Sequence, residues 1–245
     1  MPTLTDHFRT WRRRTAEAVG ITRVYERLKV PLRTAVAVHR VLRGQFGHAL
    51  SVRRLEPVDR TGMPIPWFTY PAIEFIEQLD FSAKRIFEFG AGNSTLFWCE
   101  RAASVVSVEH NPAWHQRVGA RLPANGQMLL VETKPDYAAT LGRQPGLFDV
   151  IVVDGIERRA CCVEAVHKLA RGGLIILDNS DWHHRCAEFL RSQDLLEVDM
   201  AGFGPINGYT WTTSFFFHRE FAFRPRHDRQ PRHGLGSLPI REGEA

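Results

Sequence analysis

A glycine turn placed between two carboxylates is the part of this 245-residue sequence whose spacing could do chemistry. The turn, Gly90-Ala91-Gly92, follows a short run of strand-forming residues that includes Glu88. The three residues after the turn are favourable helix N-caps, so we expect a helix to begin there: Asn93, Ser94 and Thr95. We expect this turn to leave backbone N–H groups and the positive end of a helix dipole facing open space, where a polar or anionic ligand group can bind.

A second predicted strand, Ser104 to Val108, ends at Glu109 and is followed by His110. In a strand–turn–helix–strand unit, a carboxylate at the tip of the second strand commonly accepts hydrogen bonds from two ribose hydroxyls. The turn and this carboxylate together predict a binding site for a nucleoside. The alternative is an ordinary tight turn with two solvated carboxylates, because glycine serves any tight turn.

The pattern E-x-G-x-G-x-S at Glu88 to Ser94, followed by an acid at Glu109, resembles the first two motifs of the class I S-adenosylmethionine-dependent methyltransferases. The resemblance implies that the glycine loop contacts the methionine part of the cofactor and that Glu109 binds its ribose. In that family the segment before the first strand often crosses the cofactor pocket. Trp67 and Tyr70 are therefore candidate lid residues, with packing in the core as the alternative for each. The cofactor-binding residues that we predict are Glu88, Gly90, Gly92, Asn93, Ser94, Thr95, Glu109, His110, Asp154, Trp67 and Tyr70.

A nicotinamide dinucleotide is an alternative ligand for a turn of this kind. Its fingerprint has a third glycine, which this chain lacks, and Glu88 would repel a pyrophosphate. A positively charged sulfonium that also carries an ammonium group tolerates that carboxylate. The sequence therefore favours S-adenosylmethionine over a dinucleotide.

The rest of the chain alternates between apolar strands and helices, which predicts a parallel sheet covered on both faces. The further predicted strands are Gln127 to Val131, Leu147 to Gly155, Leu174 to Leu177, Leu195 to Met200 and Trp211 to His218. Together with the resemblance, they imply an α/β fold: a Rossmann-like, doubly wound, seven-stranded sheet that is mostly parallel, with the last strand antiparallel. The connection from Gly202 to Tyr209, rich in glycine and aromatic residues, lies where an acceptor pocket could form.

Asp154 ends the fourth predicted strand, and Asp178 and Asn179 end the fifth. Ligands of open parallel sheets bind at the carboxyl ends of the strands, so we expect these residues to share one rim with Gly90 and Glu109. Two carboxylates and one amide oxygen suit an octahedral divalent cation such as Mg²⁺. The alternative, equally weighted, is that these residues only cap turns.

This second set resembles the metal site of the catechol and caffeoyl-type O-methyltransferases, in which an acid after the fourth strand and an Asp-Asn pair after the fifth hold the ion. The resemblance implies that the metal binds the acceptor hydroxyl, lowers its pKa and aligns the oxygen for attack on the sulfonium methyl group. Those enzymes carry a lysine where this chain has Glu157 to Arg159, and arginine is a poor base. The candidate bases are His183, His184 and Asp154, and we predict Asp154 and His183 as catalytic residues.

Other metal or redox chemistry is not favoured by the sequence. The four cysteines show no C-x-x-C spacing, which argues against a zinc site or a disulfide framework and favours a reducing, cytoplasmic setting: Cys99, Cys161, Cys162 and Cys186. His183 and His184 are adjacent, and adjacent residues on a helix point apart, so they are not expected to share a transition metal.

The positive charge of the chain is concentrated near its start. The first 60 residues hold 13 Lys and Arg against 5 Asp and Glu, a net +8, and the remainder holds 19 against 22, a net −3. Val30 to Leu42 has apolar residues at helical spacing with arginines between them, which predicts an amphipathic helix. Such a helix could contact an anionic membrane, contact nucleic acid or dock on the core, and docking is favoured. Aromatic residues are not interleaved with the basic run, so no nucleic-acid partner is expected.

These observations divide the chain into a basic helical arm (1–61), a class I methyltransferase domain (62–221) and a disordered tail (222–245). No apolar run is long enough to span a membrane. The predicted activity is S-adenosylmethionine-dependent methylation, of oxygen on a small-molecule or sugar hydroxyl, with Mg²⁺ assistance as an option. The alternatives are an enzyme that uses NAD or a nucleotide sugar, and a non-catalytic nucleoside-binding module held to a partner by the basic arm.

Overall fold

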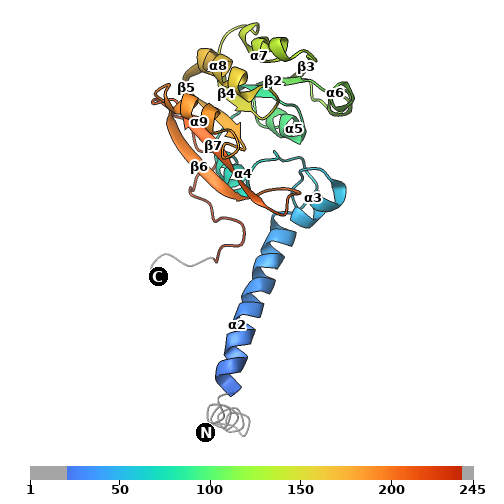
Figure 1. Cartoon of the computed structure of the whole chain (residues 1–245), viewed down its shortest axis with the longest axis vertical. Helices are drawn as coiled ribbons and strands as arrows, with labels where there is room; N and C mark the ends of the chain where they lie inside the picture. Colours follow the sequence, from blue (N-terminus) through green and yellow to red (C-terminus); the bar gives the residue numbers. More distant parts are fainter. Residues whose placement is uncertain (1–20, 239–245) are drawn as a thin grey trace.

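The computed structural model describes residues 21–238, with side chains described from residue 29 onward, and its centre is one seven-stranded sheet. The strands are β1 (Arg85–Phe89), β2 (Ser104–Glu109), β3 (Gly126–Leu130), β4 (Phe148–Val153), β5 (Leu169–Asp178), β6 (Leu196–Phe203) and β7 (Thr210–Phe217). Their order is β3-β2-β1-β4-β5-β7-β6, and only β7 runs antiparallel to its neighbours. This confirms the predicted Rossmann-like doubly wound sheet with an antiparallel last strand (Figure 1).

Helices precede the sheet and cover both of its faces. The N-terminal helices are α2 (Ile21–Arg40), η1 (Val41–Gln45), α3 (His48–Arg54) and α4 (Tyr70–Ile76). The helices between strands are α5 (Asn93–Cys99), α6 (Pro112–Gly119), α7 (Lys134–Gly142), α8 (Arg158–Lys168) and α9 (His184–Arg191). The sequence analysis did not predict α7, and it placed the start of β5 at Leu174, because Gly172 and Gly173 interrupt the apolar run there.

Apolar side chains alternate between the two faces of the sheet, and they form one hydrophobic core on each face. Val150 and Val152 of β4 pack in a cluster with α4 and α5, whereas Ile151 and Val153 pack in a second cluster with α7, α8 and α9. Successive strand side chains point to opposite faces, so an uninterrupted β-branched run is what a strand buried on both faces requires. Four of the five strands that pair in parallel, β1, β2, β4 and β5, end at one rim, where Gly90 follows β1, Asp154 follows β4, and Glu109 and Asp178 are the last residues of β2 and β5.

The basic arm is helical, as predicted, but it does not dock on the core. Helix α2 projects away from the sheet domain (Figure 1), and its described apolar side chains are exposed to solvent. These exposed residues are Val30, Leu32, Val36 and Val38. The preference for docking was wrong because helical spacing of apolar residues shows that a face can be buried, and does not show what buries it. In the described part of the chain, no helix combines the length and the apolar character that crossing a bilayer needs.

The ends of the predicted domain make contacts that the sequence did not indicate. Residues up to 61 were assigned to the arm, yet Ser51 exchanges hydrogen bonds with the Val58 backbone, and the Asn93 side chain donates to Pro57 O at 2.7 Å. The expected disordered tail also contacts the core: a bridge joins Pro225 to Leu79. Residues 1–20 of the predicted arm and 239–245 of the predicted tail lie outside the described residues.

The position of β7 inside the sheet gives a stability prediction. Phe216 on β7 is completely buried between β5 and β6, whereas Phe203 at the end of β6 is 43% exposed. Truncation of a buried phenylalanine to alanine costs about 3–5 kcal/mol, so we expect Phe216→Ala to lower the free energy of unfolding by that amount. The matched variant Phe203→Ala should lose less than about 1 kcal/mol. Denaturant titration measures both, and equal losses would show that β7 is not an inner strand.

Candidate functional site

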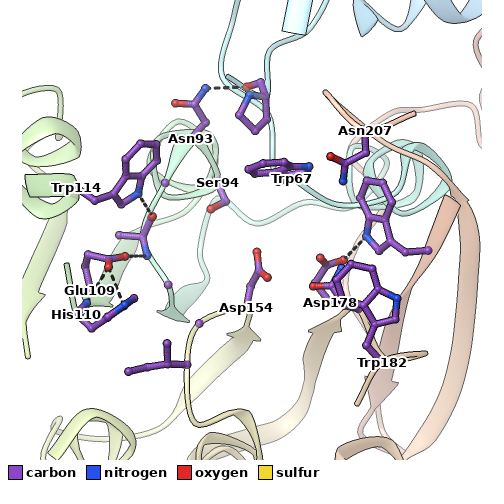
Figure 2. Close-up of a pocket in the computed structure, with 18 of the residues that line it drawn as sticks. Trp67, Asn93, Ser94, Glu109, His110, Trp114, Asp154, Asp178, Trp182 and Asn207 are labelled. Carbon is purple, nitrogen blue, oxygen red and sulfur yellow. Dashed lines mark hydrogen bonds and ion pairs between the residues drawn. The ribbon is translucent and has the colours of Figure 1, made fainter. Parts of the chain in front are cut away.

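A cavity of about 480 Å³ opens at the carboxyl ends of the parallel strands. Figure 2 shows its two sides: Trp114, Glu109 and His110 lie on one side, and Trp182 and Asn207 lie on the other, with Asp154 between them. Of the residues that the sequence analysis singled out, the cavity wall contains Trp67, Gly90, Gly92, Asn93, Ser94, Glu109, His110, Asp154, Asp178 and Asn179. Residues predicted from five separate segments thus meet in one cavity.

The glycine turn is held by its own hydrogen bonds. Gly90 has φ +93°, and a Cβ at this position would lie 2.8 Å from the backbone oxygen of Asp154, so a side chain would be excluded by both strain and contact. The Gly90 N–H donates to Val108 O at 2.9 Å, the Ala91 N–H to Glu109 Oε2 at 3.2 Å, and the Gly92 N–H to Thr95 Oγ1 at 3.0 Å. The expectation that these N–H groups are unpaired was wrong for all three residues of the turn.

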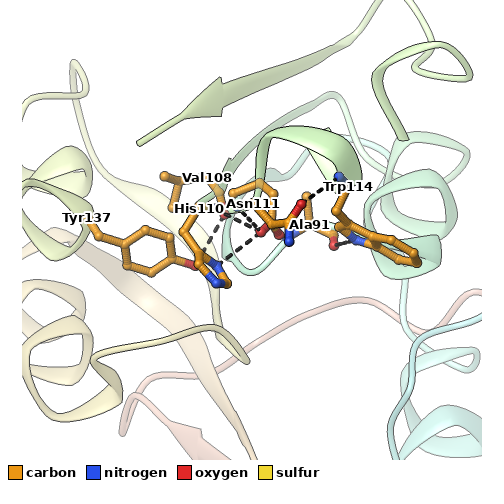
Figure 3. Close-up of polar contacts among 7 residues, drawn as sticks. Ala91, Val108, His110, Asn111, Trp114 and Tyr137 are labelled. Atoms are coloured by element: carbon orange, nitrogen blue, oxygen red, sulfur yellow. Dashed lines mark hydrogen bonds and ion pairs between the residues drawn. The ribbon is translucent and has the colours of Figure 1, made fainter. Parts of the chain in front are cut away.

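Glu109 joins the turn to the second strand. Figure 3 shows Ala91 of the turn together with His110, Asn111 and Trp114, which come after the strand. Its Oε1 accepts from the backbone N–H groups of His110 at 2.9 Å and Asn111 at 2.8 Å, while Oε2 accepts from Ala91. Trp114 donates its indole N–H to Ala91 O at 2.6 Å, which fixes this side of the cavity. A carboxylate offers about four acceptor positions, so Oε2 keeps one for a ligand hydroxyl.

Glu88 and Thr95 were predicted to contact the cofactor, but they lie beneath the turn and do not line the cavity. Glu88 is completely buried, and its Oε2 accepts from Thr95 Oγ1 at 2.5 Å and from Ser107 Oγ at 2.8 Å. Its Oε1 has no partner, and burial raises the pKa of Glu88 to about 7 despite the hydroxyl donors. Glu88 is the residue before the last in β1 and is buried, whereas Glu109 is the last residue of β2 and lines the cavity.

Asp154 and Asp178 face the middle of the cavity and share one arginine. Arg158 donates from Nη2 to Asp154 Oδ1 at 2.9 Å, from Nε to Gly155 O at 3.0 Å, and from Nη1 to the backbone oxygen of Asp178. The Asp178 Oδ1 accepts from Trp211 Nε1 at 3.0 Å and from Thr213 Oγ1 at 2.5 Å. Arg158 does not itself line the cavity, so it acts behind Asp154 and not as a ligand contact.

Burial sets the protonation of this pair. Burial raises the pKa of Asp154 to about 6, although the Arg158 guanidinium lowers it. Burial, together with the nearby charge of Asp154, raises the pKa of Asp178 well above its usual range. Two carboxyl groups that repel each other titrate as a coupled pair, so ionisation of one disfavours ionisation of the other.

The predicted magnesium site does not fit this arrangement. The cation beside Asp154 is already supplied by Arg158, and the Asp178 Oδ1 is committed to two donors. Residues 21–238 contain no cluster of three or more His, Cys, Asp or Glu side chains that could hold a metal ion. The resemblance to the metal site of the catechol-type enzymes therefore stops at the residue types of Asp154, Asp178 and Asn179, because Arg158 takes up the charge that a metal would balance.

Two further predicted residues are outside the cavity. Tyr70 is 4% exposed and packs against Phe46 with ring centroids 4.4 Å apart, with its hydroxyl 3.2 Å from His48 Nδ1, so its assignment as a lid residue was wrong. His183 is at the N-cap position of α9 without a side-chain capping hydrogen bond, and it does not line the cavity, so the structure does not bring this predicted catalytic residue to the site. Burial, and then the nearby Arg158, lower the pKa of His183.

Sequence reasoning missed most of the aromatic wall. The lining side chains that were not anticipated are Trp114, Trp182 and Trp211, together with Leu55 and Pro57 from the predicted arm. Asn207 and Tyr209 also line the cavity, and they belong to the connection from Gly202 to Tyr209, where an acceptor pocket was expected. Four of the six tryptophans of the chain are in this one cavity. A further signal is backbone strain: four of the five described non-glycine residues with positive φ are in the wall or next to it, namely Leu55, Glu157, Asn179 and Ile206. Strain of this kind gathers at functional sites.

The charged side chains of the cavity wall are acidic. Glu109, Asp154 and Asp178 contribute carboxyl groups, and no Lys or Arg is found among the described residues that line it. The cavity is thus suited to a ligand that carries positive charge, although the whole chain has a net charge of +5.

No protein-family model matches the chain, and no curated protein sequence matches it. Among solved structures, the O-methyltransferase TomG from Streptomyces achromogenes, in complex with SAM, is similar over 70% of this chain and 88% of TomG, with 16% identity and a TM-score of 0.50. Precorrin-6y C5,15-methyltransferase from Geobacter metallireducens GS-15 aligns over 60% of this chain and 86% of its own, with 14% identity and a TM-score of 0.47. The N-methyltransferase NodS from Bradyrhizobium japonicum WM9, in complex with SAH, aligns over 56% and 79%, with 18% identity and a TM-score of 0.43. At such identities the likeness to TomG shows the fold, which agrees with the strand order.

The buried Glu88 gives a pH-dependent stability prediction. A carboxyl group whose pKa is raised from 4.5 to about 7 stabilises the fold below pH 4.5, and this contribution is lost as the pH rises through 7. Gln cannot ionise, so the stability of Glu88→Gln relative to the unchanged protein should rise by about 2 kcal/mol between pH 5 and pH 8. Denaturant titration at the two pH values measures this difference. Parallel pH dependences of the two proteins would rule out a proton on Glu88.

Proposed function

We propose that this protein is an S-adenosylmethionine-dependent methyltransferase that methylates a hydroxyl oxygen of a small molecule or sugar. The observation that carries the proposal is an acidic cavity without Lys or Arg among its described lining residues, built beside a carboxylate at the tip of β2. That combination selects a nucleoside with positive charge. The Rossmann-like fold shared with TomG agrees with it.

The residues that line the cavity fit both the nucleoside part and the methionine part of S-adenosylmethionine. Glu109 keeps one acceptor position toward the cavity for a ribose hydroxyl, and Trp114 and His110 beside it offer flat surfaces for the base. A Cβ at Gly92 would meet only Ser94 Oγ, at 3.7 Å, so the turn leaves room for a chain to pass. Asp154 would balance the positive charge of the methionine part. When bound, S-adenosylmethionine supplies an electrophilic methyl group on its sulfonium.

The same features disfavour NAD and nucleotide sugars. A pyrophosphate needs free backbone N–H groups or basic side chains. In this structure the N–H groups of Gly90, Ala91 and Gly92 are already bonded, and the described wall offers three acidic side chains and no basic side chain of Lys or Arg. The non-catalytic module remains the second candidate, since the projecting α2 helix offers a surface for a partner.

In the proposed reaction Asp154 is the general base. Its carboxylate accepts the proton of the acceptor hydroxyl as the oxygen attacks the methyl carbon, and a pKa of about 6 keeps most of the group ionised at neutral pH. Arg158 orients Asp154 from behind, and Trp211 and Thr213 hold Asp178 in place.

Glu109 is the residue to vary in a binding test. Glu109→Ala removes the proposed ribose acceptor, and loss of a charged hydrogen bond of about 1.5–3 kcal/mol corresponds to roughly 10- to 100-fold weaker binding. We expect isothermal titration to show this loss for S-adenosylhomocysteine, while the control Glu100→Ala, on the surface, binds as the unchanged protein does. Binding of NAD with no binding of S-adenosylhomocysteine would support the dinucleotide alternative instead.

The base assignment gives a pH-dependence prediction. Only ionised Asp154 can accept a proton, so kcat/KM should fall about tenfold per pH unit below an inflection near 6. Because Arg158 lowers the pKa of Asp154, Arg158→Met should move the inflection to higher pH. Asp154→Asn should lower turnover by about 10²- to 10⁴-fold at pH 7.5. A profile with the same inflection in Arg158→Met would exclude Asp154 as the titrating base.

A further inference from the structure

Exposed aromatic side chains gather at the mouth of the cavity. Among the described residues five large aromatic side chains are exposed, and four of them line this cavity: Trp67, Trp114, Trp182 and Tyr209. Trp182 is 58% exposed, Tyr209 50% and Trp67 43%. Exposure of large apolar groups is unfavourable, and a cluster of them around one opening is typical of a ligand-binding surface.

These aromatic residues belong to two parts of the cavity. Trp114 is tied to the glycine turn and lies on the Glu109 side, whereas Trp182 lies on the opposite side with Asn207 (Figure 2). Asp154, the proposed base, is between the two sides. If the nucleoside occupies the Glu109 side, the surface around Trp182 and Tyr209 is where the acceptor lies.

The rings on the acceptor side form an open platform. The ring centroids of Trp182 and Tyr209 are 6.2 Å apart with planes inclined by 36°, and those of Tyr209 and Trp211 are 6.0 Å apart and inclined by 61°. Neither of these two pairs is parallel, so neither forms a slot that would sandwich a flat aromatic ligand. They suit a ligand that rests one apolar face on the platform and keeps its other face in water.

Uncommitted polar groups surround the platform. The side-chain amides of Asn179 and Asn207 make no hydrogen bond with other described residues, and Asp154 keeps its Oδ2 free of protein donors there. Amide and carboxylate groups at the edge of an aromatic surface match a ligand with several hydroxyls on its rim and a face of C–H groups. A phenol or catechol, with one or two hydroxyls, would leave these amides unpaired.

We propose that the acceptor is an electrically neutral pyranose, stacked on Trp182 and Tyr209 with one ring hydroxyl directed at Asp154. The absence of Lys and Arg from the described wall excludes uronic acids and sugar phosphates, whose charge would be unpaired beside three carboxyl groups. This inference rests on the proposed function for its chemistry. The sugar oxygen forms a bond to the methyl carbon, the carbon–sulfur bond breaks with its electron pair going to sulfur, and the hydroxyl proton goes to Asp154.

Saturation-transfer NMR on the full chain tests the proposal, with and without saturating S-adenosylhomocysteine. The probes are methyl α-D-mannopyranoside, methyl β-D-glucopyranoside and methyl α-L-rhamnopyranoside, with catechol, glucuronate and glucose 1-phosphate as comparators. We expect saturation of the C–H protons of at least one neutral glycoside and none for the two charged sugars. Trp182→Ala should weaken that binding by about tenfold, because one stacking surface is lost.

Phe203→Ala is the matched control, because it removes an exposed aromatic ring outside the cavity. It should leave glycoside binding unchanged, and Trp182→Ala should keep its melting temperature and its affinity for S-adenosylhomocysteine. The proposal is overturned if no neutral glycoside is saturated, if catechol or a charged sugar is saturated in its place, or if Trp182→Ala binds the glycoside as before. Glycoside binding by a protein that does not bind S-adenosylhomocysteine would overturn the proposed methyl transfer and leave the sugar site standing.

Discussion

Carboxyl groups brought together at one rim of the sheet are the constraint on which the site depends. Parallel strands must end on the same side, so β2, β4 and β5 bring Glu109, Asp154 and Asp178 to one cavity. Burial opposes the ionisation of Asp154 and Asp178, the charge of Asp154 adds to this effect at Asp178, and Arg158 offsets only part of it from behind Asp154. A positively charged ligand would offset the rest, which ties the proposed cofactor to the topology of the sheet.

The second half of the cavity comes from the antiparallel end of the sheet. The turn between β6 and β7 carries Asn207 and Tyr209, and the segment after β5 carries Trp182, so the proposed acceptor side is built from other segments than the Glu109 side. Loops at strand ends are where specificity is placed on a fixed scaffold. The platform of exposed rings is consistent with a ligand that is apolar on one face and polar around its edge.

Local sequence patterns were sufficient to predict the sheet and the position of the glycine turn, because β-branched runs and turn residues determine structure over a few positions. They were insufficient where a residue's role depends on partners far along the chain. Trp67 and Tyr70 are three positions apart, yet one lines the cavity and the other is buried against Phe46. Arg158 pairs with Asp154 four residues earlier, but its contact with the backbone oxygen of Asp178, at the end of the neighbouring strand, joins residues 20 positions apart. Trp114, Trp182 and Tyr209 meet only once the fold has formed.

The most direct measurement is a crystal structure of the protein with S-adenosylhomocysteine bound. The account predicts the ribose hydroxyls within hydrogen-bond distance of Glu109, the base beside Trp114, and the thioether sulfur directed toward Asp154 and the open platform of Trp182 and Tyr209. A nucleoside bound with its ribose away from Glu109, or with its sulfur turned away from Asp154, would contradict the central claim that this acidic rim is a methyl-transfer site.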